Sequence, residues 1–165
     1  MNTEPTIIER ASQPYVAISA KVRMAEIGTA VPPLSEEVSR WLGMHGVKSS
    51  GPAFWRYTVI DMSRYLQIEA GEPTQEPVGG DERVHAGVLP AGRYATLRHI
   101  GAPQTLIDAT GSLLEWADGQ GLRWDVSPSP EGERWGCRLE VYHTNPQDQP
   151  DMNKWETELA FRLAD

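Results

Sequence analysis

Phe54-Trp-Arg-Tyr-Thr-Val-Ile60, followed by Tyr65-Leu-Gln-Ile-Glu-Ala70, is the stretch that decides the fold of this 165-residue chain. Both runs are rich in β-branched and aromatic residues, and the short polar segment Asp61-Met-Ser63 between them is typical of a turn. We therefore predict two neighbouring strands that run antiparallel.

The segments before this hairpin predict one more strand and a helix. Residues 7–22 are rich in β-branched side chains and are broken once at Gln13-Pro14, as at a sheet edge or bulge. Pro32-Pro33 then begins a helical pattern that Gly46 ends. The apolar positions of this pattern are Leu34, Val38, Trp41 and Leu42. The first half, about residues 5–73, thus has the order β-α-β-β.

The second half, about residues 83–165, repeats this order after a Pro- and Gly-rich linker at about 74–82. A strand over 84–100 is interrupted at Pro90-Ala-Gly92, and a helix then starts at Gly101-Ala-Pro103. Strands are predicted over 134–144 and 155–163. The apolar stripe of the predicted helix is Leu106, Ile107, Leu113, Leu114 and Ala117. Residues 1–165 are therefore expected to form one α+β domain with an internal duplication.

Composition narrows the classes of function. The formal net charge of −8 opposes nonspecific binding to nucleic acid or to an anionic membrane. Cys137 is the only cysteine, so no disulfide forms within the chain, and no apolar run approaches the length of a membrane span. The four histidines do not fall at zinc-type spacings, and no phosphate-binding loop is present. We expect a cytoplasmic protein without metal or cofactor.

Glu140 is the residue that strand periodicity singles out. In a strand, Leu139, Val141 and His143 share one face, whereas Glu140 and Tyr142 share the other. The apolar neighbours make Glu140 a candidate buried carboxylate, while a Glu on the wet face of a sheet is the alternative.

Overlaying the two halves adds aromatic groups to this carboxylate. When Tyr57 is aligned with Tyr142, Trp55 takes the position that Glu140 holds in the other half. An indole and a carboxylate facing one cleft would suit lipophilic cations, which bind through apolar contact, cation–π attraction and charge.

Five motifs in order resemble the GyrI-like small-molecule-binding domain family over about residues 6–164. They are Gly51-Pro-Ala-Phe-Trp-Arg-Tyr-Thr-Val-Ile-Asp61, Leu66-Gln-Ile-Glu-Ala-Gly-Glu-Pro73, Leu89-Pro-Ala-Gly-Arg-Tyr-Ala-Thr-Leu-Arg-His-Ile-Gly101, Arg138-Leu-Glu-Val-Tyr-His-Thr-Asn-Pro146 and Trp155-Glu-Thr-Glu-Leu159. The resemblance implies duplicated β-α-β-β units that form an extended antiparallel sheet, with two helices on one face and a ligand groove between them.

The same resemblance implies roles for residues and a class of ligand. Glu140 would lie at the base of the groove. Tyr94 would lie near it, and the alternative is a core tyrosine whose hydroxyl has a hydrogen-bond partner within the protein. Trp55, Tyr57 and Tyr142 are expected to line the groove, and Trp124 and Trp155 are expected either to line it or to fill the core. The ligands would be small aromatic or lipophilic, often cationic, drug-like molecules.

Relatives of this kind include effector-sensing domains of AraC-type and MerR-type regulators, standalone binding proteins and hydrolases that open cyclopropane rings. In the hydrolase alternative, Glu140 would be the general base, and Tyr94 or Tyr142 would polarise a carbonyl. The two helical segments lack the short connection of a helix-turn-helix, so we expect no direct contact with nucleic acid. Any protein partner, such as a regulator or gyrase, is a further hypothesis.

Overall fold

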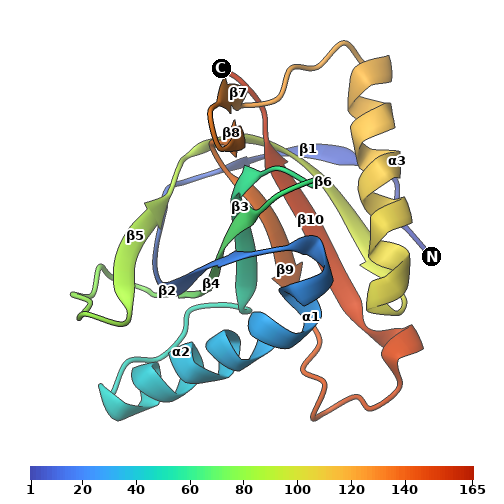
Figure 1. Cartoon of the computed structure of the whole chain (residues 1–165). Helices are drawn as coiled ribbons and strands as arrows, with labels where there is room; N and C mark the ends of the chain where they lie inside the picture. The colour runs from blue at the N-terminus through green and yellow to red at the C-terminus, as the bar shows by residue number, and fades with distance from the viewer.

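The computed structural model describes residues 1–165, and its two main helices lie on one face of a strongly curled antiparallel sheet (Figure 1). The strands are β1 (Thr6–Arg10), β2 (Gln13–Val22), β3 (Phe54–Ile60), β4 (Leu66–Pro73), β5 (His85–Leu89), β6 (Gly92–Ile100), β7 (Val126–Ser129), β8 (Gly132–Trp135), β9 (Arg138–Tyr142) and β10 (Glu156–Arg162). The helices are α1 (Ile27–Ala30), α2 (Pro32–Met44) and α3 (Leu106–Gly119), with short 3-10 turns η1 (Met24–Glu26), η2 (Pro103–Thr105) and η3 (Met152–Lys154).

The strand order confirms the duplication and shows how the two halves join. The main path is β1-β6-β10-β9-β3-β4-β2-β5, and the short β7–β8 hairpin attaches to β3. The halves meet at β9 and β3, and the outer strands are exchanged: β1 of the first half pairs with β6, and β5 of the second half pairs with β2. Each half therefore supplies one edge strand to the other.

The helices begin and end where the sequence predicts. Pro32 occupies the first turn of α2, where the missing amide hydrogen costs nothing. Gly46 follows the end of α2 with a φ of 67°, a left-handed conformation that glycine adopts without a steric penalty. The helix turns Val38, Trp41 and Leu42 toward the sheet, where they are buried.

Three predictions need correction, two in the second half and one in the first. Residues 134–144 are not one strand, because the chain bends at Gly136 and Cys137 between β8 and β9, and β7 was not predicted. Ile107 does not belong to the buried stripe of α3, since it is 72% exposed and Ala109 is buried instead. The strand predicted over 65–70 extends to Pro73.

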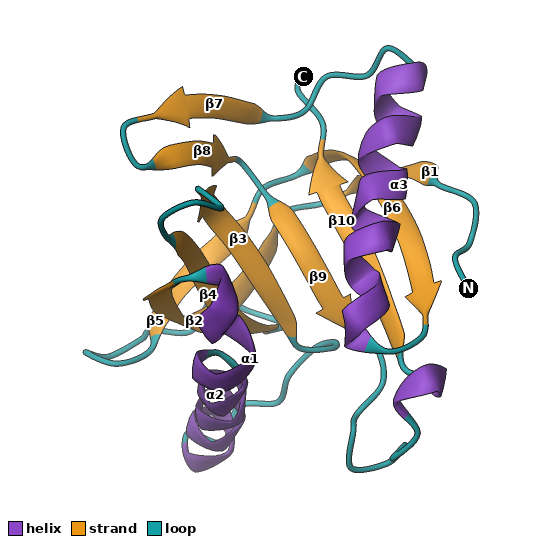
Figure 2. Ribbon diagram, turned by 45° about the vertical axis from the view of Figure 1, so that its right-hand side comes forward, coloured by secondary structure: helices purple, strands orange, loops and turns teal.

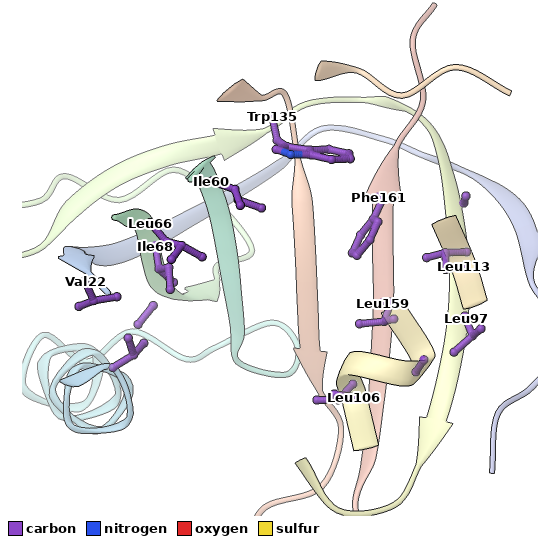
Figure 3. Close-up of a cluster of buried hydrophobic side chains, with 14 of the residues drawn as sticks. Val22, Ile60, Leu66, Ile68, Leu97, Leu106, Leu113, Trp135, Leu159 and Phe161 are labelled. Atoms are coloured by element: carbon purple, nitrogen blue, oxygen red, sulfur yellow. The ribbon is translucent and has the colours of Figure 1, made fainter. Parts of the chain in front are cut away.

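On the helix-bearing face, one cluster of buried apolar side chains reaches both helices. Figure 3 shows Val22, Leu66 and Ile68 close to α2, and a second group beneath α3. That second group contains Leu97, Leu106, Leu113 and Leu159. The two helices thus pack on apolar side chains on either side of the central strands.

Candidate functional site

The central strands β9 and β3 run between the two helices on the helix-bearing face, which we call the helix face (Figure 2). Helix α2 packs on β2 and β4, and α3 packs on β6. Trp55 on β3 is the cross-strand partner of Glu140 on β9, so both side chains point to the same face. Overlaying the halves in sequence had brought the same two residues into correspondence.

Glu140 is the acceptor of a small hydrogen-bond network. The hydroxyl of Tyr142 donates to its Oε1 at 2.6 Å, and the hydroxyl of Tyr57 donates to the same oxygen at 3.1 Å. The edge of Trp55 meets the ring of Tyr142 at 5.2 Å between centroids, and Trp55 Nε1 donates to Ser35 Oγ of α2 at 2.9 Å. We call Trp55, Tyr57, Glu140 and Tyr142 the carboxylate–aromatic site.

The network sets the protonation of its members. Burial raises the pKa of Glu140, although the hydrogen bonds from Tyr142 and Tyr57 and the charge of Arg138 act in the opposite direction. Burial and the nearby carboxylate raise the pKa of both tyrosines, so their hydroxyls stay protonated and remain donors. All four residues of the site are half-buried.

Arg138 is a neighbour that the sequence reasoning missed. It precedes Glu140 by two residues on β9, and its guanidinium carbon lies 4.5 Å from the ring centroid of Phe161 and 4.7 Å from that of Trp135. The alternation that places Glu140 on the helix face also places Arg138 there, and this rule could have found it. The arrangement sets a cation among aromatic rings beside the carboxylate.

Tyr94 lies apart from Glu140, which corrects the hydrolase pairing based on these two residues. It packs in the core of the opposite face with Tyr15 and Leu139, and it is 1% exposed. Its hydroxyl donates to the carbonyl of Pro90 at 2.6 Å. Tyr94 also lines a hollow of about 350 Å³ on that opposite face, so the sheet separates it from the carboxylate–aromatic site.

Trp124 and Trp155, the other two tryptophans considered for the groove, do not contact Glu140. Trp124 packs against Trp135 and Phe161, with ring centroids 5.8 Å away in both cases, and therefore belongs to the cluster that holds Arg138. Trp155 precedes β10, and its Nε1 donates to the carbonyl of Gln149 at 2.7 Å, in the loop before that strand. No interaction joins Trp155 to Glu140.

The model of the GyrI-like small molecule binding domain matches residues 3–164. The chain belongs to this family. The crystal structure of the EcmrR C-terminal domain is similar over 98% of this chain and 97% of its own, with 16% identity and a TM-score of 0.75. The EcmrR chain in its cryo-EM complex with DNA gives the same TM-score, at 17% identity over 97% of this chain, and this GyrI-like chain spans 57% of that chain.

Two further solved structures have a similar fold; one was solved with a bound aromatic cation, and the other is named as a hydrolase. SAV2435 bound to tetraphenylphosphonium is 10% identical over 98% of this chain and 94% of its own, with a TM-score of 0.64. A hydrolase from Listeria innocua is 14% identical over 98% of this chain and 92% of its own, with a TM-score of 0.59. At these identities the likeness concerns the fold. No curated protein sequence matches the chain.

The placement of side chains and the length of the helices bear on metal binding and membrane insertion. No group of three or more His, Cys, Asp or Glu side chains is placed to hold a metal ion. None of the helices combines the length and the apolar character needed to cross a membrane.

Proposed function

We propose that this GyrI-like chain binds small aromatic or lipophilic molecules, often cationic, at the carboxylate–aromatic site between α2 and α3. The observation that carries the proposal is the half-buried Glu140, whose carboxylate accepts two tyrosine hydrogen bonds beside the indole of Trp55. The binding would serve capture or sensing of such compounds.

The preference for a cation follows from the surroundings of Glu140. Burial disfavours its ionised form, so a positive charge brought near it relieves part of that cost. The rings of Trp55, Tyr57 and Tyr142 supply apolar area and cation–π attraction with few directional demands. The GyrI-like fold of SAV2435 was solved with tetraphenylphosphonium, an aromatic cation of this class.

The proposal also includes an effect of the bound ligand on a second protein, such as a regulator or gyrase. The net charge of −8 opposes direct binding of these 165 residues to DNA, because polyanions repel each other.

Quenching of tryptophan fluorescence tests the proposal, because Trp55 lies within the site. Titration with tetraphenylphosphonium should quench the fluorescence to saturation, and neutral triphenylphosphine oxide should bind more weakly. Replacing Trp55 by phenylalanine should remove most of the quenching. Flat titrations with both compounds would overturn the proposal.

A hydrolase is the second candidate, and one observation favours it. Glu140 has its pKa raised by burial and lies against two protonated tyrosines, which suits a general base that activates water. Water would lose a proton to Glu140 and attack a cyclopropane carbon, and the ring bond would break toward a conjugated carbonyl polarised by Tyr142. The oxyanion formed there would take up the proton from Glu140, so that one water is added and the carboxylate is restored. Tyr94 takes no part in this version, because it lies on the opposite face.

Mass spectrometry of a cyclopropane-bearing alkylating compound incubated with the protein separates the two candidates. Addition of one water, lost in the Glu140→Gln variant, would support the hydrolase. An unchanged compound that still quenches the fluorescence would support binding alone.

A further inference from the structure

Arg138 carries hydrogen-bond donors that the protein leaves without acceptors. Its guanidinium lies against the rings of Trp135 and Phe161, and it forms neither an ion pair nor a hydrogen bond with another side chain. On the opposite face, the two terminal nitrogens of Arg56 donate to Tyr15 and to the carbonyl of Gly136, while its Nε is buried without a partner. Arg138 is thus held by stacking and keeps its donors free.

Arg138 is half-buried, and none of its nitrogens is fully buried without a partner, so its free donors reach solvent at the edge of an aromatic cluster. Burial lowers the pKa of Arg138, and the charges of Glu140 and Glu133 only partly oppose it. An acceptor brought to these donors would offset part of the desolvation of the guanidinium. Trp135 Nε1 beside it is buried without a partner. Two kinds of donor therefore lack acceptors in one cluster next to Glu140.

Neutralising Glu140 does not explain the position of Arg138. The Oε1 of that carboxylate already accepts from Tyr57 and Tyr142, and no nitrogen of Arg138 comes within ion-pair distance of it. A residue selected to cancel the charge would use the planar, two-pronged contact for which arginine is suited. The guanidinium carbon instead lies over the rings of Trp135 and Phe161, and its nitrogens bond to no other side chain.

We propose that Arg138 binds an anionic or carbonyl oxygen of the ligand, so that the site selects aromatic molecules that are dipolar. The cationic part of such a molecule would face Glu140, and its acceptor oxygen would face Arg138. This inference rests on the proposed function and adds a second recognition element to the same site. It predicts that a carboxylate on an aromatic cation improves binding.

Rhodamine B and its ethyl ester provide the test. Both dyes carry the same planar cation, and only rhodamine B carries a free carboxylate at neutral pH. Fluorescence anisotropy should give a dissociation constant for rhodamine B at least about tenfold lower than that of the ester. Arg138→Met should remove this preference by weakening rhodamine B, since methionine still fills the space between the rings.

A matched control separates local recognition from net charge. Arg134 on β8 is more than half exposed, so Arg134→Met makes the same change in total charge away from the site and should leave both affinities unchanged. Arg138→Lys retains the charge without the planar fork and should recover part of the preference. Circular dichroism of each variant checks that the fold is retained.

The outcomes test the role of Arg138 separately from the proposed function. The inference is wrong if wild type binds both dyes equally, or if Arg138→Met leaves the affinity for rhodamine B unchanged and only tightens the ester. In either case tetraphenylphosphonium binding would still support the proposed function. If wild type binds neither dye nor tetraphenylphosphonium, the proposed function fails as well.

Discussion

Replacing Glu140 by glutamine keeps the shape of the side chain and removes its charge. The hydroxyls of Tyr142 and Tyr57 still find an amide oxygen at the Oε1 position, but each bond changes from charged to neutral, a loss of about 1 kcal/mol. The raised pKa of Glu140 shows that burial outweighs these bonds for the ionised carboxylate. The free energy of unfolding at pH 7 should therefore rise slightly, by no more than about 1 kcal/mol.

The pH dependence of this gain follows from the direction of the shift. A carboxyl whose pKa is raised on folding costs stability only where the unfolded chain is ionised. The cost is absent below about pH 4 and grows as the pH rises through the folded pKa. Urea unfolding of wild type and Glu140→Gln should coincide near pH 3, and the variant should be the more stable at pH 7.

Ligand binding should respond to the same change in the opposite direction. Removing a partly desolvated charge from a cation contact costs about 2–4 kcal/mol, which is a loss of about 30- to 900-fold in affinity. Calorimetric titration of both proteins should show this loss for tetraphenylphosphonium. Neutral triphenylphosphine oxide should bind both proteins with nearly equal affinity, because it carries no net charge for the Glu140 carboxylate to attract.

The comparison of these two ligands tests whether Glu140 interacts with the charge of the ligand. An equal loss for both would mean that the substitution changes the shape of the site. No loss for either would mean that Glu140 does not face the ligand, even if the variant is as stable as expected.

Three other changes test separate parts of the structure. Tyr94→Phe removes the bond to the Pro90 carbonyl and should cost about 1 kcal/mol in urea unfolding, while tetraphenylphosphonium binding should not change; weaker binding would place the ligand on the opposite face. Asp81 accepts hydrogen bonds from two backbone amides and an indole, which lower its pKa to about 2. Asp81→Asn should therefore lower the melting temperature at pH 7, and the difference from wild type should fade as the pH falls through 2; a difference that stays constant would contradict this. Tyr142→Phe removes a hydrogen bond to Glu140 and should raise the pKa of this carboxyl further. As the pH is lowered, the variant should lose its affinity for tetraphenylphosphonium at a higher pH than wild type; an unchanged midpoint of affinity against pH would show that the bond does not tune the carboxylate.

Local patterns predicted the elements from which the site is built. The run 54–60 forms β3, the helix after Pro32-Pro33 is present, and alternation along β9 separates Leu139 from Glu140. The internal duplication also aligned Trp55 with Glu140, which the sheet brings together as cross-strand partners. These features depend on period and on local turn chemistry, which a sequence carries directly.

Features that depend on long-range pairing escaped prediction. The exchange of β1 and β5 between halves is decided by which sheet edge each strand meets, and strand propensity does not specify the partner. The face of Tyr94 depends on where β6 starts after the break at Gly92, and a shift of one residue reverses it. Arg138 was overlooked because an arginine on a strand is usually taken as exposed, whereas aromatic rings cover this one.

A crystal structure of the protein with tetraphenylphosphonium bound is the most direct test of the central claim. We expect the cation between α2 and α3, with its rings on Trp55, Tyr57 and Tyr142 and its charge toward Glu140. A cation found in the hollow beside Tyr94 on the opposite face, with the carboxylate–aromatic site left empty, would contradict it.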